Sequence, residues 1–173
     1  MKILGIDPGI GRTGYGIIEV ISSKLQVISF GCFETEPNSK PSDRLMKIYD
    51  KIIELIKKYK PEALSIEELF FNNNAKTAFL VGQARGVILL AAEQKKVPIF
   101  IYTPLQVKVA VTGYGRAEKS QVGKMVKAIL KLDKIPKPDD TTDALAIALC
   151  HAFSSKIRST NIETRNNTKI KMT

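Results

Sequence analysis

The sequence predicts an α/β domain in which three strands form a meander and are followed by helices and strands in alternation. Residues 2–33 contain apolar runs of strand length, separated by turns rich in glycine, proline and serine. From residue 42 onward the apolar residues recur at helical spacing, interrupted by short apolar runs at 63–66 and 97–101. This order of elements is typical of a sheet that helices cover.

The first predicted strand, residues 2–7, ends in an acid. The run is apolar and is stopped by Pro8 and Gly9, so we expect a buried strand with Asp7 at its carboxyl end. Open α/β sheets usually carry their chemistry at that edge. Asp7 is therefore the first candidate active-site residue, and each later acid is considered by whether it can reach the same edge.

Residues 9–14 match the G-x-G-x-x-G pattern of dinucleotide-binding proteins, but no helix follows them as such a site requires. Residues 15–21 are β-like and are interrupted by Gly16, which predicts a second strand ending near Ile21. After a turn at 22–24, a third strand is expected from about Leu25 to Phe33. The pattern thus favours an antiparallel meander over a nucleotide site.

An amphipathic helix comes after the meander. Apolar residues recur every three or four positions from Leu45 to Tyr59, and Pro61 ends the run. The fourth strand, at 63–66, leads directly into Glu67 and Glu68. Successive strand residues point to opposite faces of a sheet, so only one of these two glutamates can easily share a site with Asp7.

A long helix is expected from about Ala75 to Gln94, with small residues along one stripe: Ala75, Ala78, Gly82 and Gly86. Glycine costs about 1 kcal/mol relative to alanine inside a helix, so the stripe predicts close approach of another backbone. That backbone belongs either to the chain's own sheet or to a second copy of the protein. Residues 97–101 predict the fifth strand, and Thr103 with Pro104 opens a short helix that carries Lys108.

A glycine loop at 112–116 ends in Arg116 and leads to a helix with lysines on its polar side: Lys119, Lys124, Lys127 and Lys131. The last helix is expected to begin with Asp139 as its N-cap and has an apolar stripe of Ala144, Ile147, Cys150 and His151. Asp140 and Asp143, three residues apart, continue that inward stripe.

The length and composition indicate one domain, at residues 1–155, followed by a flexible basic tail at 156–173 that lacks periodicity. The 27 Lys and Arg against 17 Asp and Glu predict an anionic partner such as nucleic acid. The chain has no apolar run of membrane-spanning length and no signal-peptide pattern, so we expect a cytoplasmic protein without membrane contact. Cys32 and Cys150 fit reduced core thiols, and His151 fits a core or surface residue.

Each acid has a simple structural explanation, as a turn residue, a solvated strand end or a partner of a helix dipole. Their joint placement is harder to explain in this way, because two acids end buried strands and two lie on a helix that should pack on those strands. Carboxylates so close repel one another unless cations neutralise them. Without Cys or His ligands, such a cluster suits Mg²⁺ or Mn²⁺. In a basic chain this predicts a divalent-metal site that cuts a polyanion.

Several motifs occur in a fixed order: Gly5-Ile6-Asp7-Pro8-Gly9, Ile66-Glu67 with Phe70, Gly82-Gln83-Ala84-Arg85-Gly86, Ala117-Glu118-Lys119-Ser120-Gln121-Val122, and Asp140 with Asp143-Ala144-Leu145-Ala146-Ile147-Ala148. Through these motifs the chain resembles the RuvC family of Holliday junction resolvases, in the ribonuclease H-like superfamily, over about residues 1–153.

The resemblance implies a ribonuclease H-like fold, with a five-stranded mixed sheet of three antiparallel and two parallel strands. It also implies a homodimer that cuts four-way junction DNA symmetrically and works with the RuvA–RuvB branch-migration motor. The catalytic and metal-binding acids map onto Asp7, Glu67, Asp140 and Asp143, with two Mg²⁺ ions per subunit expected and Mn²⁺ as a substitute. Expected DNA contacts are Lys108, Lys119, the aromatic Phe70 and Arg116.

Three alternatives stay open at this point. A related nuclease of the same superfamily would cut an RNA–DNA hybrid with the same metal chemistry. A catalytically silent protein would bind junctions without cutting them, although the complete acid set argues against it. A sugar kinase or actin-like ATPase also begins with an apolar strand ending in Asp-x-Gly, but it needs two such domains, and 173 residues supply one.

Overall fold

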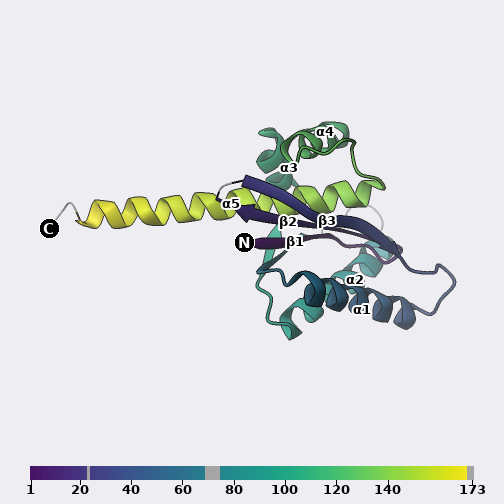
Figure 1. Cartoon of the computed structure of the whole chain (residues 1–173). Coiled ribbons are helices and arrows are strands. Elements are labelled where there is room, and N and C mark those ends of the chain that lie inside the picture. Colours follow the sequence, from purple (N-terminus) through teal and green to yellow (C-terminus); the bar gives the residue numbers. More distant parts are fainter. Residues whose placement is uncertain (23, 69–74, 171–173) are drawn as a thin grey trace.

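A five-stranded mixed sheet in the order β3-β2-β1-β4-β5 forms the centre of the molecule (Figure 1). The computed structural model describes residues 1–22, 24–68 and 75–170, with side chains described except at 75–77 and beyond Ser155. The strands are β1 (Lys2–Asp7), β2 (Arg12–Ile21), β3 (Lys24–Glu34), β4 (Ala63–Glu67) and β5 (Ile99–Tyr102). β1, β2 and β3 pair antiparallel, whereas β1–β4 and β4–β5 are parallel. The predicted meander and the two parallel additions are confirmed.

The helices lie in two layers, one on each face of the sheet (Figure 1). They are α1 (Pro41–Tyr59), α2 (Ala75–Gln94), α3 (Pro104–Thr112), α4 (Lys119–Ile129) and α5 (Asp139–Ile170). Side chains alternate along β1, so Leu4 packs with α1 and α2 while Ile3 packs with α3, α4 and α5. The sheet therefore divides the core into two apolar clusters, each covered by its own helices.

The central helix α5 packs directly on the sheet and is covered on its other side by α3 and α4. All residues from 144 to 152 are buried, which is more than the single apolar stripe predicted from the sequence. The reason is that α5 has protein on both sides. A Cβ placed on Gly5 would contact the carbonyl oxygen of Ala144 and lie 2.7 Å from the Ala148 nitrogen. Glycine at this position lets α5 approach the backbone of β1 closely.

Several element ends differ from the predicted ones. β5 begins at Ile99 rather than Val97, because the Val97 N–H donates to the Ala92 carbonyl, 3.0 Å away, and so belongs to the end of α2. Asp139 is not an N-cap but the first residue of α5, and its carboxylate accepts a hydrogen bond from Lys137 Nζ at 2.6 Å. α5 continues as a helix to Ile170, through most of the segment predicted as a flexible tail. The flexibility of residues 156–173 stays a prediction.

The segment with the G-x-G-x-x-G pattern is a turn between two strands. The Thr13 hydroxyl donates to the Gly9 carbonyl at 2.8 Å, and Arg44 Nη2 donates to the Ile10 carbonyl at 3.2 Å. β2 starts at Arg12, so no helix N-terminus faces this turn. The predicted antiparallel meander is confirmed over this segment.

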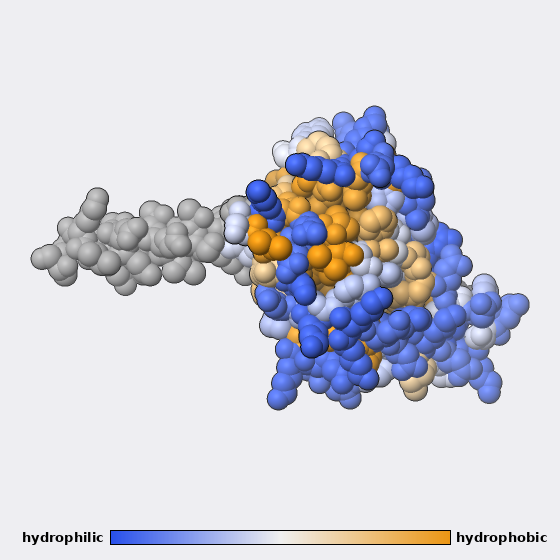
Figure 2. Space-filling view, viewed as in Figure 1, coloured by the Kyte–Doolittle hydropathy of each residue, from blue (hydrophilic) through white to orange (hydrophobic). Residues whose placement is uncertain are grey.

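The surface is largely hydrophilic over α1 and α4, and an apolar area lies over β2 and β3 (Figure 2). β3 is an edge strand of the sheet, with Phe30 41% exposed. Cys150 is a buried thiol and Cys32 is a half-buried one, and neither forms a disulfide. His151 is a core residue whose Nδ1 lies 2.7 Å from the Tyr102 hydroxyl. Among the helices that the structure describes, none is both long and apolar enough to cross a membrane.

Candidate active site

Asp7 and Glu67 end neighbouring parallel strands at the same edge of the sheet. The strands are in register up to the pair Ile6 and Ile66, so Asp7 and Glu67 are the next residues on each. Gly5 and Ser65 also form a pair, and the Cβ position of Gly5 faces α5. Side chains two residues further along a strand point to the same face. Asp7 and Glu67 therefore both point toward the α5 side of the sheet.

The structure also distinguishes the two neighbouring glutamates. Glu67 is partly buried and lines a cavity together with Asp143, whereas Glu68 is exposed. The Glu68 N–H continues the hydrogen-bond ladder between β4 and β5 by donating to the Tyr102 carbonyl at 2.8 Å. Alternation along β4 thus directs Glu67 into the site and Glu68 away from it.

The first turn of α5 places two more acids beside this edge. A Cβ on Gly14, which pairs with Asp7 across β1 and β2, would collide with the Asp140 carbonyl oxygen. The start of α5 is therefore held against the part of β2 that lies next to Asp7. Asp140 and Asp143 are both partly exposed there, in a helix whose following residues are buried.

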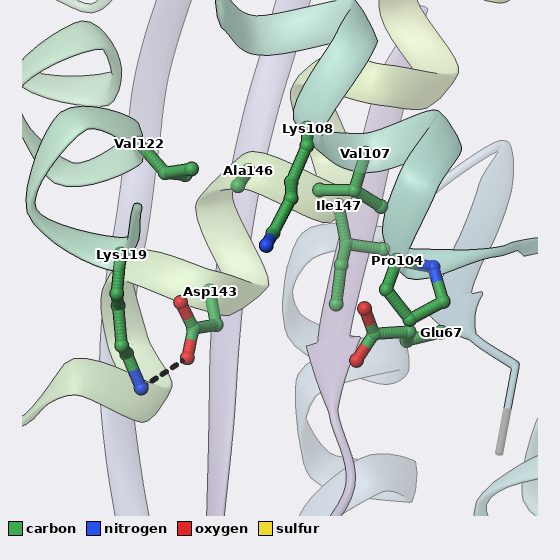
Figure 3. A pocket seen from close by; sticks show the side chains of 9 residues that line it. All are labelled: Glu67, Pro104, Val107, Lys108, Lys119, Val122, Asp143, Ala146 and Ile147. Carbon is green, nitrogen blue, oxygen red and sulfur yellow. Dashed lines mark ion pairs between the residues drawn. The ribbon is translucent and has the colours of Figure 1, made fainter. Parts of the chain in front are cut away.

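A cavity of about 260 Å³ opens between α3, α4, α5 and the end of β4 (Figure 3). Its lining consists of Glu67, Pro104, Val107, Lys108, Lys119, Val122, Asp143, Ala146 and Ile147. Lys119 Nζ lies 2.8 Å from Asp143 Oδ2, and Lys108 extends from α3 toward the space between Asp143 and Glu67 (Figure 3). The cavity thus joins two carboxylates and two ammonium groups above an apolar floor. Asp7 and Asp140 are not among its lining residues.

Electrostatic interactions connect the two carboxylates of the cavity with Asp7 and Asp140, which do not line it. Burial raises the pKa of Asp7 to about 8, and the negative charges of Asp143, Glu67 and Asp140 add to the increase. Burial also raises the pKa of Glu67 and of Asp143, although Lys119 opposes the increase at Asp143. The other three predicted acids therefore lie close enough to influence Asp7.

Metal-free protein is expected to lose stability as the pH rises from about 4 to about 8. The pKa of Asp7 rises from 3.8 to about 8 on folding, so the folded state binds a proton that the unfolded state releases within this interval. The stabilisation is complete below the unfolded pKa and is lost as pH approaches the folded one. Asp7→Asn should remove this part of the loss, as measured by thermal melting in a chelator across that pH range. If the Tm falls equally with pH in the original protein and in Asp7→Asn, the assigned burial and charge coupling of Asp7 are contradicted.

Arg12 belongs to the site although the sequence analysis did not select it. Its Nη1 lies 3.5 Å from Asp140 Oδ2, and its Nε donates to Glu34 Oε1 at 3.0 Å. β2 begins at Arg12, directly after the turn that follows Asp7, so Arg12 lies at the same edge of the sheet. The predicted meander therefore contained a signal for Arg12. It is a cation at the start of the strand that pairs with the strand of Asp7.

The donor set suits a hard divalent cation, because its members are carboxylates and neither cysteine nor histidine is among them. In the described part of the chain, no three acidic, histidine or cysteine side chains are close enough to hold one ion. Instead, Arg12 pairs with Asp140 and Lys119 pairs with Asp143. These cations neutralise the carboxylates in the way that a metal ion would.

The predicted DNA contacts are placed as follows. Lys108 and Lys119 line the cavity, and Lys119 also pairs with Asp143, so it is more closely joined to the acids than expected. Arg116 is exposed in the loop before α4 and does not line the cavity. Phe70 lies outside the described residues.

Comparisons with known proteins agree with this geometry. The family model described as crossover junction endodeoxyribonuclease RuvC matches residues 3–151. The relative named crossover junction endodeoxyribonuclease RuvC from Desulforamulus reducens is 55% identical over 152 residues, which cover 88% of this chain and 93% of that protein. Its counterpart from Caldicellulosiruptor saccharolyticus is 54% identical over 156 residues, covering 90% and 94%.

A solved structure shares the whole arrangement. T. thermophilus RuvC in complex with Holliday junction substrate superimposes with a TM-score of 0.86 at 39% identity, covering 91% of this chain and 96% of that one. This similarity includes the mixed sheet and its flanking helices, and confirms the ribonuclease H-like fold that the sequence predicts. The chain belongs to the RuvC family of crossover junction endodeoxyribonucleases.

Proposed function

We propose that the protein is a Mg²⁺-dependent endonuclease that resolves Holliday junctions during recombination and repair of DNA. The observation that carries the proposal is the convergence of acids from β1, β4 and α5 beside lysines from α3 and α4. Acids of this kind suit metal ions, and the lysines suit phosphate. Family membership adds the substrate class, since a relative of this fold was solved with a Holliday junction.

Asp7, Glu67, Asp140 and Asp143 would hold two Mg²⁺ ions per subunit, with Mn²⁺ as a substitute. When bound, such a pair activates water and stabilises the leaving oxygen of a phosphodiester. The chain's own contribution is to keep the carboxylates at the rigid ends of β1 and β4 and at the start of the buried helix α5. The apolar wall of Val107, Val122 and Ile147 limits water on the inner side of the cavity.

Lys108 and Lys119 would bind the backbone of the DNA strand that enters the cavity. Their ammonium groups lie beside the carboxylates that would hold metal, as a phosphate bound to both requires. Lys119 would exchange its ion pair with Asp143 for phosphate once a metal ion neutralises that acid. Arg116 and Phe70 would extend the contact surface toward the junction, as the family resemblance implies.

A cleavage panel tests this function. The protein is incubated with a four-way junction, a linear duplex and an RNA–DNA hybrid, with Mg²⁺ or with a chelator. We expect symmetric nicks in the junction only, with 5′-phosphate and 3′-hydroxyl ends, and only with Mg²⁺. Preferential cutting of the hybrid would identify a different nuclease of this superfamily. Junction binding without cutting at any metal concentration would identify a silent binding protein.

We also propose that the protein acts as a homodimer through one face of α2. Phe79 is 66% exposed and Leu90 is 61% exposed, and Gly86 lies between them on the same side of the helix. A Cβ on Gly86 would have no neighbour within 4 Å, so this side does not face the chain's own sheet. Of the two explanations for the small-residue stripe, the structure therefore contradicts the one in which Gly86 packs on the sheet. A two-fold dimer would present two sites to two strands of a junction.

Gly86→Leu is expected to weaken the dimer without unfolding the subunit. In the single chain the new side chain meets open space, whereas at a contact between two copies it would overfill the interface and cost about 1–3 kcal/mol. Sedimentation at a series of concentrations should then show an increase of about 5- to 150-fold in the dimer dissociation constant. Gly86→Ala is the smaller control. A Gly86→Leu protein that remains fully dimeric would exclude this face as the interface.

Two further assignments follow from the family resemblance. We infer a cytoplasmic location, where chromosomal DNA is accessible, and cooperation with the RuvA–RuvB branch-migration motor. Cleavage of a junction in the presence of that motor should be faster than cleavage by the protein alone. Equal rates would indicate that this protein works independently.

A further inference from the structure

A second cavity, of about 320 Å³, shares Lys119 with the first. Its lining consists of Lys119, Ser120, Gly123, Lys124, Ile135, Lys137, Asp139 and Thr142. Lys119 lines both cavities, so the two adjoin at this side chain. A chain molecule that occupies the first cavity can therefore continue directly into the second.

The charge of this cavity is positive. Three ammonium groups, from Lys119, Lys124 and Lys137, face one carboxylate, that of Asp139. Asp139 lies 2.6 Å from Lys137 Nζ and 3.8 Å from Lys119 Nζ. Among the described residues, Lys124 has no carboxylate partner within ion-pair distance. Because Lys137 pairs with Asp139 and Lys119 pairs with Asp143, the ammonium group of Lys124 remains as one positive charge available to an anionic ligand.

The walls of the cavity are fixed to the start of α5. The Thr142 hydroxyl donates to the Pro136 carbonyl at 2.9 Å, and the Thr141 N–H donates to the Pro138 carbonyl at 3.0 Å. These bonds hold the segment that carries Lys137 against the turn that carries Asp140 and Asp143. On the opposite wall, a Cβ on Gly123 would lie 3.3 Å from Ile135, so α4 packs closely against the same segment. The backbone that carries Lys124 and Lys137 is thus held in place relative to the candidate catalytic acids.

We propose that this second cavity binds further backbone phosphates of the same DNA strand that enters the first cavity, with Lys124 and Lys137 as the contacts. The inference rests on the proposed function, because DNA at the first cavity is what brings further phosphates past Lys119. A DNA strand carries a phosphate about every 3.4 Å along the duplex axis, so a strand with one phosphate in the first cavity has further phosphates on both sides of it. The polar lysine lining suits phosphate rather than bases, so the contact positions the DNA without reading its sequence.

The test measures junction binding against salt concentration, in a chelator so that no cutting occurs. The double variant Lys124→Gln/Lys137→Gln should reduce the slope of log affinity against log salt by about 1.8, or about 0.9 for each lost contact. The control is Lys47→Gln/Lys57→Gln, which removes the same charge from exposed positions on α1, on the opposite face of the sheet. The control should leave the slope within about 0.3 of the original. Lys124→Arg/Lys137→Arg should preserve the slope.

Cleavage by the double variant distinguishes positioning from catalysis. We expect a higher KM for the junction and an unchanged kcat at saturating junction, since neither lysine contacts the acids that would hold metal. An unchanged salt slope, or a loss equal to that of the α1 control, would overturn the proposal. If the original protein neither binds nor cuts junctions, the proposed function itself fails. That result differs from one in which the original protein binds junctions and the two substitutions leave the salt slope unchanged, which overturns only the second-cavity proposal.

Discussion

Asp7→Asn is expected to remove nearly all cleavage of a four-way junction while leaving junction binding intact. Asparagine keeps the size of the side chain but loses the charge that would hold Mg²⁺. Metal-ion catalysis of this kind supplies several kcal/mol, and a loss of about 4 kcal/mol lowers kcat by about 10³-fold. The buried position of Asp7, surrounded by the charges of three other acids, makes it the residue most dependent on a cation. Single-turnover cleavage in Mg²⁺ measures the effect.

The matched control is Glu68→Gln, which neutralises an exposed acid next to the site and should leave turnover near normal. Glu67→Gln, Asp140→Asn and Asp143→Asn should each resemble Asp7→Asn. Binding is expected to be equal or stronger for these variants in a chelator, because each removes a negative charge close to the DNA. Normal cutting by one of them would remove that residue from the proposed metal site, and a collapse in Glu68→Gln would show that the wrong glutamate was chosen.

Much of the site could be predicted from the sequence because its parts are local. A buried strand that stops at Pro8 must place Asp7 at its end, and a second apolar strand does the same for Glu67. The helical spacing of Asp140 and Asp143 puts them on one side of α5 without any knowledge of the tertiary structure. Register between β1 and β4 then settles which of the two adjacent glutamates faces the site, and that register was outside the reach of the local pattern.

What could not be predicted depends on contacts between distant segments. The meander indicates that Arg12 lies near Asp7, but its partner Asp140 is 128 positions away, and nothing in the spacing of either residue indicates the pairing. The same applies to α5, whose full burial follows from α3 and α4 lying on its outer side. The small-residue stripe of α2 left two packing partners open, and only the open space beside Gly86 excludes the chain's own sheet.

Close packing of α5 on β1 leads to the second large effect. Gly5→Ala should destabilise the protein by about 3 kcal/mol or more, because its new methyl group would collide with the backbone of α5. The contacts are the Ala144 carbonyl oxygen and the Ala148 nitrogen, and the second of them would lie only 2.7 Å away. Neither atom can move without shifting the helix. For a chain of this size, 3 kcal/mol lowers Tm by about 6–12 °C.

The same displacement should reduce cleavage more than the loss of stability alone explains. α5 carries Asp140 and Asp143, so a helix pushed away from β1 separates these acids from Asp7 while the protein is still folded. Cleavage is therefore compared at a temperature well below the Tm of the variant, where both proteins are fully folded by circular dichroism. Gly11→Ala is the control, since its Cβ would meet only Arg44 Nη2, at an ordinary 3.6 Å. A Gly5→Ala protein with the original Tm and cleavage rate would show that α5 does not need this close approach to place its acids.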